Sequence, residues 1–274
     1  MLIIFISFGI ILQQFNFAVQ MRRLFQMKTQ TLRAEVTDEK QLDQALQYNG
    51  FQYIYAPERL LTSSTPDKDR IIAVPPVFLA DCERYMNERL KELHEMGFEH
   101  ALAHTVDHIL LIRSAGMVLH GGSRLNITNS VSADFFAEQG FEDIILSVEL
   151  TVKRINTLKT TVPKGITAYG RLPLMINRRC PINDGKPCNN GSQCGKTLTD
   201  RRGKTIVPIC SNTVELLNPD TLNIADKLSD FSAADFFLLK FTVEKDIISI
   251  ADEFRNGRKP TGDYTRGLYY RGVE

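Results

Sequence analysis

The chain has 274 residues, of which 43% are hydrophobic and 24% charged, and its 33 Lys and Arg nearly balance 32 Asp and Glu. This content allows a large core, which excludes a disordered chain and a small scaffold that needs disulfides or metal to fold. The net charge of +1 argues against a protein whose whole surface grips nucleic acid, although a local basic groove remains compatible with it.

The first thirty residues are apolar at their start and basic only afterwards. Residues 2–12 read LIIFISFGIIL, and Gln13 ends this apolar run. A membrane span needs about 20 apolar residues, and a signal peptide carries its basic residues before the apolar stretch. We therefore expect residues 1–30 to be a leader outside the folded domain, either a misplaced start or the stump of a longer chain, with a membrane anchor as the alternative. Without an export signal, we expect a cytoplasmic protein with no stable membrane insertion.

From residue 31 onward, short apolar strands alternate with amphipathic helices. Asp38 or Thr37 caps the first helix, Asn49-Gly50 ends it, and Pro75-Pro76 stops the third strand. The predicted strands are residues 31–36, 52–56, 71–74, 100–104, 117–120 with a continuation through 125–127, 143–147, 166–169 and 236–241. The predicted helices are residues 39–47, 79–96, 106–115, 130–139, 152–158 and 247–254.

Strands separated by helices in this way predict an α/β fold with parallel strands covered by helices. The eight units fit a closed (β/α)8 TIM-like barrel, with residues 31–274 as a single domain. An open doubly wound sheet is the alternative, but it normally carries a Gly-rich phosphate turn after its first strand, and this sequence has none. Residues 180–226 interrupt the repeat and predict a Cys-rich insertion between strands 7 and 8.

Four of the five cysteines lie in this insertion. Their spacing is Cys180-x7-Cys188-x5-Cys194-x15-Cys210, without a CxxC pair. Four convergent thiolates can hold a tetrahedral Zn²⁺ or a 4Fe–4S cluster, and the spacing does not choose between them. Unrelated thiols or adventitious disulfides are the remaining alternatives. Cys82, early in a predicted helix, is expected to be a buried small hydrophobic residue.

Polar side chains follow the carboxyl ends of the predicted strands, where barrel enzymes build their sites. Glu149 follows an apolar strand, and burial there would favour its protonated form and suit it to acid–base catalysis. The candidate catalytic residues are Glu149, Tyr169 and Arg171, with Glu244 at the same rim. The candidate substrate-binding residues are His104, His120, Asn126, Asn129, Arg178 and Arg179. Helix capping and rim packing are the alternative roles.

Other polar residues carry weaker signals. Basic residues crowd the insertion, where a cationic rim could receive phosphates or carboxylates, and a solvated loop is the equal alternative. They are Arg171, Arg178, Arg179, Lys186, Lys196, Arg201, Arg202 and Lys204. We expect His94, His100 and His108 to be surface or packing residues without clustered partners.

Several motifs occur in order along the chain, and together they resemble one family. They are Ile72-Ala73-Val74-Pro75-Pro76, Asn126-Ile127-Thr128-Asn129-Ser130, residues 143–150, residues 169–175, Arg178-Arg179-Cys180-Pro181, Asp200-Arg201-Arg202-Gly203 and residues 265–270. On these motifs the chain resembles the collagenase-like peptidases, peptidase family U-32, over roughly residues 31 to 274. The resemblance is closest to the second barrel of long, two-barrel members, so a partner barrel absent from this chain is expected.

The resemblance implies a TIM-like barrel and, by family naming, a peptidase. Other members are oxygen-independent hydroxylation factors for transfer RNA, ribosomal RNA or ubiquinone precursors, and in several of them four Cys bind a 4Fe–4S cluster. The matching residues here are Cys180, one or both of Cys188 and Cys194, and Cys210. The family motif after strand 7 has His and Cys where this chain has Tyr169 and Pro173, so a cluster would take its fourth thiolate from the loop.

Three classes of function follow from these observations. The first is a peptidase with a four-Cys metal or iron–sulfur loop at the barrel mouth. The second is an iron–sulfur hydroxylase acting on tRNA, rRNA or a small aromatic, in which Arg171, Arg178 and Arg179 position an anionic substrate. The third is a non-catalytic accessory barrel with a structural metal. The substrate, peptide or RNA, stays open at this point.

Overall fold

The computed structural model describes residues 30–77, 82–183, 196–210 and 213–272. Residues 31–274 form one compact unit. Apart from Gln30, the predicted leader lies outside the described residues, as do Cys188 and Cys194. Within the described ranges, no helix is long and apolar enough to cross a membrane.

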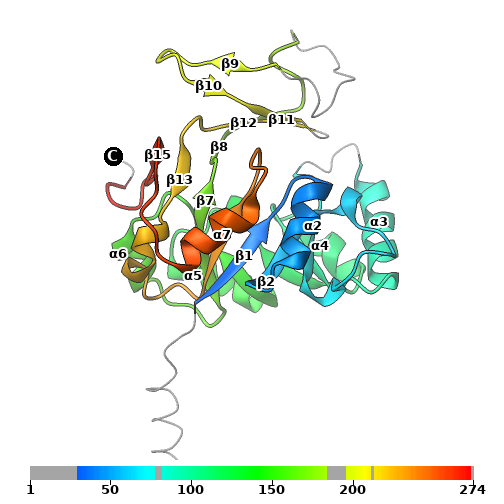
Figure 1. Ribbon diagram of the computed structural model, residues 1–274. Coiled ribbons are helices and arrows are strands. Elements are labelled where there is room, and N and C mark those ends of the chain that lie inside the picture. The colour runs from blue at the N-terminus through cyan, green and yellow to red at the C-terminus, as the bar shows by residue number, and fades with distance from the viewer. Residues whose placement is uncertain (1–29, 78–81, 184–195, 211–212, 273–274) are drawn as a thin grey trace, which may run out of the picture. The chain divides into compact units, whose positions relative to one another are not determined.

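Eight parallel strands close into a barrel. Neighbouring strands follow chain order from β1 to β7, and β14 pairs in parallel with both β7 and β1 (Figure 1). The barrel strands are β1 (Thr31–Glu35), β2 (Phe51–Pro57), β3 (Ile71–Val74), β4 (His100–Ala103), β5 (Val118–Gly121), β6 (Phe141–Ile145), β7 (Lys164–Gly170) and β14 (Phe236–Lys240). This closed parallel sheet confirms the predicted (β/α)8 TIM-like barrel.

Helices cover the outside of the barrel, and several begin at a side-chain cap. Asp38, Asn129 and Asp246 each accept a hydrogen bond from the backbone N–H three residues later. The helices are α2 (Glu39–Gln47), α3 (Glu83–Glu95), α4 (His108–Ser114), α5 (Ser130–Glu138), α6 (Val152–Thr157) and α7 (Ile247–Arg255). The helix predicted at 79–96 corresponds to α3, and its first three predicted positions lie outside the described residues.

Alternation along the strands divides the apolar residues between two buried clusters. On β14, Phe237 and Leu239 belong to the large cluster that joins strands and helices, whereas Phe236 and Leu238 belong to a smaller cluster of barrel residues. Tyr55, Ile72, Leu102 and Ile145 complete the smaller cluster. The period of two residues is the reason why one strand supplies both clusters.

The fifth strand is shorter than predicted. β5 ends at Gly121, and the expected continuation through 125–127 is wrong, because Ser123–Leu125 forms a 3-10 turn. Asn126 then adopts a left-handed conformation, with φ 51°, which is incompatible with the extended backbone of a strand. Only Ile127 returns to the sheet, as an isolated bridge to Leu146.

The segment between β7 and β14 contains strands that are not part of the barrel repeat. β8 (Pro173–Asn177), β12 (Val214–Leu217) and β11 (Pro208–Cys210) form an antiparallel sheet, which we call the roof sheet. β9 (Leu198–Thr199) and β10 (Thr205–Ile206) form a hairpin. β13 (Thr221–Asn223) pairs antiparallel with β7 and in parallel with β15 (Tyr264–Thr265). The departure from the barrel repeat therefore begins at Pro173, earlier than the predicted Cys180.

Candidate functional site

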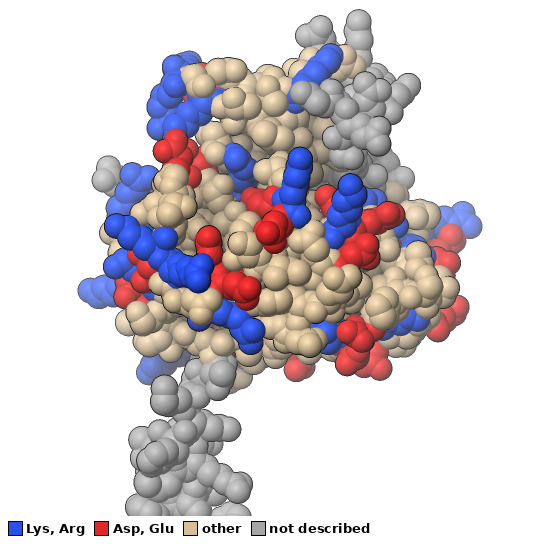
Figure 2. Space-filling view, viewed as in Figure 1, with Lys and Arg blue, Asp and Glu red and all other residues tan. Residues whose placement is uncertain are grey.

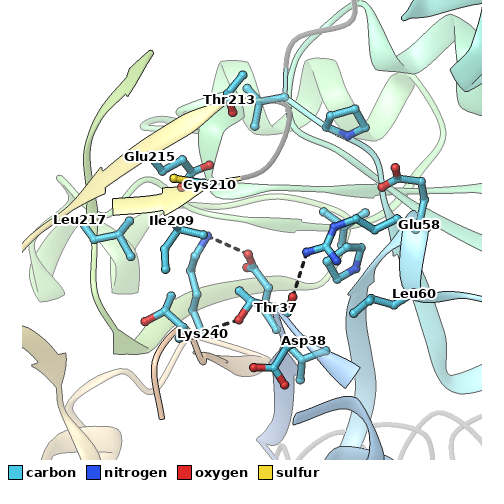
Figure 3. Close-up of a pocket in the computed structure, with 18 of the residues that line it drawn as sticks. Thr37, Asp38, Glu58, Leu60, Ile209, Cys210, Thr213, Glu215, Leu217 and Lys240 are labelled. Atoms are coloured by element: carbon cyan, nitrogen blue, oxygen red, sulfur yellow. Dashed lines mark hydrogen bonds and ion pairs between the residues drawn. The ribbon is translucent and has the colours of Figure 1, made fainter. Parts of the chain in front are cut away.

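A pocket of about 790 Å³ lies where the carboxyl ends of the barrel strands meet the roof sheet (Figure 3). Glu35 and Lys240, the last residues of β1 and β14, line it from the barrel. Ile209 and Glu215 line it from β11 and β12. Barrel enzymes place their chemistry at this end of the strands, so this pocket is the candidate site.

Strand register brings the first pair of charges together. Glu35 and Lys240 are aligned partners in the parallel ladder of β1 and β14, and their side chains form a 2.7 Å ion pair. Burial opposes the positive charge of Lys240, but the carboxylates of Glu35 and Glu215 outweigh it and raise the pKa of Lys240 above its ordinary value. Lys240 is therefore a cation throughout the neutral pH range.

His104 follows β4 and is 7% exposed. Its backbone N–H donates to Nδ1 of His108 over 3.1 Å. Burial, with further contributions from Arg124 and Lys240, lowers the pKa of His104 well below its ordinary value. Its own Nδ1 atom is buried and has no hydrogen-bond partner in the part of the chain that the structure describes. His104 is therefore a neutral imidazole at the edge of the pocket.

A second ion pair connects the barrel to the roof sheet. Arg124, in the turn after β5, lies 2.7 Å from Glu215 on β12. A smaller pocket of about 250 Å³ adjoins the first, because both are lined by Glu35, His104, Arg124 and Lys240. These four side chains form the boundary between the two pockets and are the polar centre of the candidate site.

The same pocket has an acid that sequence reasoning missed. Glu58 follows β2, lines the larger pocket and is 8% exposed (Figure 3). Burial raises the pKa of the Glu58 carboxyl, against opposing hydrogen bonds from the backbone and the charges of Arg59 and Arg89. Glu58 directly follows an apolar strand, as the other candidate residues do. This position in the sequence could have identified it as a candidate.

A family model described as peptidase family U32 matches residues 72–240, more than half of the chain. The chain belongs to peptidase family U32. Among solved structures, one similar to this U32 chain is described as "The Structure of the U32 Peptidase Mk0906". It has 10% sequence identity and a TM-score of 0.47, and the match covers 79% of this chain and 94% of the other. No curated protein matches the sequence. The family resemblance predicted from the motifs is thereby confirmed.

Three of the predicted catalytic and substrate-binding residues of the U32 chain line the pockets. His104 lines both, while Asn126 and Glu149 line the smaller one. The expectation that Glu149 is buried is wrong: its side chain is exposed, because the residue stands in a turn beyond the end of β6. Asn126 accepts a 2.6 Å hydrogen bond from the hydroxyl of Ser147. Residues that follow strand ends thus line the pockets as predicted, whereas Glu149 is exposed where burial was expected.

Tyr169 and Arg171 do not line either pocket. The ring of Tyr169 packs beside Phe241 and Phe254 in the cluster under the helices, and its hydroxyl lies 3.3 Å from Glu244. Burial first, and Glu244 next, raise the pKa of Tyr169, so its phenol keeps its proton. Arg171 donates to the backbone carbonyls of Asn218 and Pro219 and so connects the turn after β7 to the turn between β12 and β13.

The remaining predicted binding residues lie apart from the pockets. Asn129 caps α5 by accepting a 2.9 Å hydrogen bond from the backbone N–H of Ser132, which is the alternative role considered for it. Arg178 and Arg179 are exposed and follow β8. Glu244 accepts hydrogen bonds from the backbone N–H groups of Thr242 and Val243. Asn129 and Glu244 therefore have structural contacts at the rim of the barrel.

His120 lies inside the barrel instead of at its mouth. Its Nδ1 atom lies 3.0 Å from Asp143, and its Nε2 atom lies 3.0 Å from Nδ1 of His100. Asp143 also forms a 2.7 Å ion pair with Arg33, which donates to the hydroxyl of Tyr55. The expectation that His100 has no clustered partner is therefore wrong, because its cross-strand neighbour His120 is remote in sequence. The same expectation for His108 is also wrong, since His104 lies four residues before it and donates to its ring.

The described cysteines of the insertion lie at one end of the roof sheet. Cys210 ends β11, and Cys180 is buried three residues after the end of β8. Val214 of β12 is aligned with both Asn177 of β8 and Cys210. No group of three or more metal-binding side chains occurs among the described residues. Cys188 and Cys194 lie outside them, so the four-Cys site stays a prediction.

Cys82 differs from the expectation made for it. It is half-buried rather than fully buried, because it stands just before the first residue of α3. Burial, and to a smaller extent Glu58, raise the pKa of its thiol. This favours the neutral thiol over a reactive thiolate.

Proposed function

We propose that this U32 protein hydrolyses peptide bonds in the larger pocket. One observation carries the proposal: His104 is a buried, neutral imidazole at the boundary between two pockets, with the cations Arg124 and Lys240 near it. A neutral imidazole has a nitrogen lone pair that can accept a proton from water. Family membership supports the peptidase class, and a volume of about 790 Å³ is in the range of substrate pockets.

The chemistry of the four boundary residues suits this reaction. The oxygen of a water molecule adds to the carbonyl carbon of the peptide while His104 accepts one proton from it. Lys240 and Arg124 provide positive charge for the oxygen that becomes anionic. The C–N bond then breaks, and the proton passes from His104 to the leaving nitrogen. The products are a carboxylic acid and an amine, and the imidazole is neutral again.

The ion pairs around His104 keep these charges in place. Glu35 holds Lys240 on neighbouring barrel strands, and Glu215 holds Arg124 from the roof sheet. Because both cations are fixed before a substrate arrives, little reorganisation is needed as charge develops. Each cation is also neutralised by its partner, so the pocket does not carry a large net charge that would restrict it to anionic substrates.

Hydrolysis of a fluorogenic peptide library by the purified protein tests the proposal. His104→Gln should lower kcat/KM at least about a hundredfold, because the general base is lost. The matched control is His94→Gln, which changes an exposed histidine of α3 outside both pockets. Undiminished hydrolysis by His104→Gln, or no hydrolysis of any peptide by the unmodified protein, would contradict the proposal.

A second proposal concerns the four cysteines of the insertion. We propose that Cys180, Cys188, Cys194 and Cys210 hold a Zn²⁺ ion or a 4Fe–4S cluster. The roof sheet supports this, since its register brings Cys210 and the end of β8 beside the same residue of β12, and Cys210 also lines the larger pocket. A zinc ion would stabilise the sheet, whereas a cluster would be the redox element of an oxygen-independent hydroxylation, in which electrons leave the RNA or small aromatic substrate.

Anaerobic purification followed by metal analysis separates these possibilities. We expect stoichiometric zinc, or iron accompanied by the visible absorbance of an iron–sulfur cluster. Cys188→Ser should lose the metal because a four-thiolate site is left with three ligands, whereas Cys82→Ser should retain it. Anaerobic protein that contains neither metal would refute the four-Cys site, and iron-free protein would refute the hydroxylase.

A further inference from the structure

The smaller pocket contains one charge that has no counterpart. Two of its lining residues are cations, but Lys240 is paired with Glu35, and Arg124 is paired with Glu215. The only other charged lining residue is Glu149. Within the described part of the chain its carboxylate forms no ion pair. A cationic group of a ligand could therefore form an ion pair with Glu149 in this pocket.

Hydrogen bonds fix the turn that carries Glu149. The backbone N–H of Glu149 donates to Oγ of Ser147 over 3.3 Å, and the backbone N–H of Leu150 donates to the carbonyl of Ser147. The Ser147 hydroxyl in turn donates to Oδ1 of Asn126, which is held in a left-handed conformation. A turn anchored in this way holds the backbone of Glu149 at the edge of the pocket, and this preorganisation reduces the cost of binding.

The walls of the pocket define what else the ligand must have. Leu102, Ile145 and Leu172 are apolar, and a short aliphatic chain fits against them. His104 is more than nine-tenths buried and lines the same pocket, so its imidazole adds a polar group beside the apolar walls. An aliphatic stem, a peptide group and a cationic nitrogen together describe part of a peptide.

We propose that the smaller pocket is a subsite for a cationic nitrogen of the substrate peptide, with Glu149 as the specificity-determining residue. The nitrogen is either the terminal α-amino group or the ammonium group of a lysine side chain. The inference rests on the proposed function, because His104 and Lys240 form the boundary of this pocket and would place the scissile bond beside it. Glu149 then selects the residue next to that bond.

The test compares matched peptides that differ by one charge. One pair has a free or an acetylated N-terminus, and the other has Lys or norleucine at the same position. We expect the original protein to favour the cationic peptide of at least one pair by about two- to tenfold in kcat/KM, as a partly exposed ion pair would give. Glu149→Gln should bring that ratio close to one, and high salt should reduce it. The pair that responds identifies the source of the nitrogen.

The matched control is Glu142→Gln. Glu142 is an exposed glutamate on the same strand, β6, and lines neither pocket, so its replacement should leave the ratio intact. An unchanged ratio in Glu149→Gln, or no preference in the original protein, would overturn the subsite.

Calorimetric titration with the same peptides separates the subsite from the proposed hydrolysis. If the peptides are not cleaved, but the cationic ones bind more tightly in a way that Glu149→Gln abolishes, the subsite stands and the proposed hydrolysis fails. If the peptides are cleaved with no dependence on Glu149, the hydrolysis stands and the subsite fails.

Discussion

His104 shows how its surroundings set the chemistry of one side chain. Burial lowers its pKa, and the nearby charges of Arg124 and Lys240 lower it further. The pKa of His108, which accepts from the backbone of His104, is also lowered, chiefly by burial. Both imidazoles are therefore neutral in the folded protein at neutral pH. A neutral imidazole has a nitrogen lone pair that can accept a proton, which is the role proposed for His104, although burial and the two cations make it a weaker base than a free histidine.

This shift makes stability depend on pH. The folded state disfavours protonated His104, whereas the unfolded chain binds a proton below about pH 6.5. The stabilisation is fully present above that pH and is lost as pH falls toward the lower, folded pKa. Urea denaturation at pH 7, 6 and 5 should show a decreasing free energy of unfolding, with His104 contributing up to about 1.4 kcal/mol per pH unit. His104→Gln should flatten the profile and exposed His94→Gln should not; equal slopes would contradict this expectation.

Inside the barrel, the charged residues contribute to stability and not to the proposed chemistry. The Arg33–Asp143 pair is almost fully buried, and the guanidinium also lies 3.5 Å from the centre of the Phe236 ring. Burial disfavours the Asp143 carboxylate, but His120 and Arg33 outweigh this and lower its pKa. Removing one partner of such a pair leaves an uncompensated buried charge, which is strongly destabilising. These residues line neither pocket, so their contribution is to the barrel and not to the proposed chemistry.

At the scale of elements, the turn between β7 and β8 decides where the roof sheet begins. Gly170 ends β7 with a φ of +121°, and a Cβ atom there would lie 2.2 Å from the backbone oxygen of Lys240. Only glycine permits this approach of β7 to the end of β14. Three residues later β8 begins, and its partner β12 carries Glu215 to the pocket.

Two alanine variants test this role of Gly170. Gly170→Ala should lower the free energy of unfolding by about 3 kcal/mol or more, because a backbone clash adds to the unfavourable positive φ. Gly140→Ala is the control: Gly140 also has a positive φ, +75°, but a Cβ atom there meets nothing within 4 Å. It should cost about 1 kcal/mol. Urea denaturation measures both, and equal losses would show that the contact with Lys240 is unimportant.

At the scale of the whole molecule, the site depends on the meeting of two structures with different topologies. The parallel barrel supplies Glu35, His104 and Lys240. The antiparallel roof sheet supplies Glu215 and one wall, and Figure 3 shows Glu215 and Lys240 in the pocket. On the face shown in Figure 2, Lys and Arg side chains alternate with Asp and Glu, in keeping with the net charge of +1. This face therefore does not present a surface of one sign.

The sequence by itself determined the barrel and the position of its mouth. Apolar runs with caps and breakers specify strands and helices locally, and eight alternating units leave few topologies open. The same pattern placed His104, Asn126 and Glu149 after strand ends, and all three line the pockets. Only the tertiary structure decided which strand-end residues face a cavity, because that depends on register and on the roof sheet.

The features of the site that the sequence did not predict arise from contacts between strands that are remote in sequence. The pairing of Glu35 with Lys240 joins residues at opposite ends of the domain, and the pairing of Arg124 with Glu215 crosses from barrel to roof. His100, His120 and Asp143 meet because β4, β5 and β6 are neighbours in the closed sheet. The hydrophobic periodicity of the sequence indicates on which face of its strand a residue lies. It does not indicate which residue of the neighbouring strand will lie beside it. Burial and charge, and hence the chemistry of these side chains, are set by that partner.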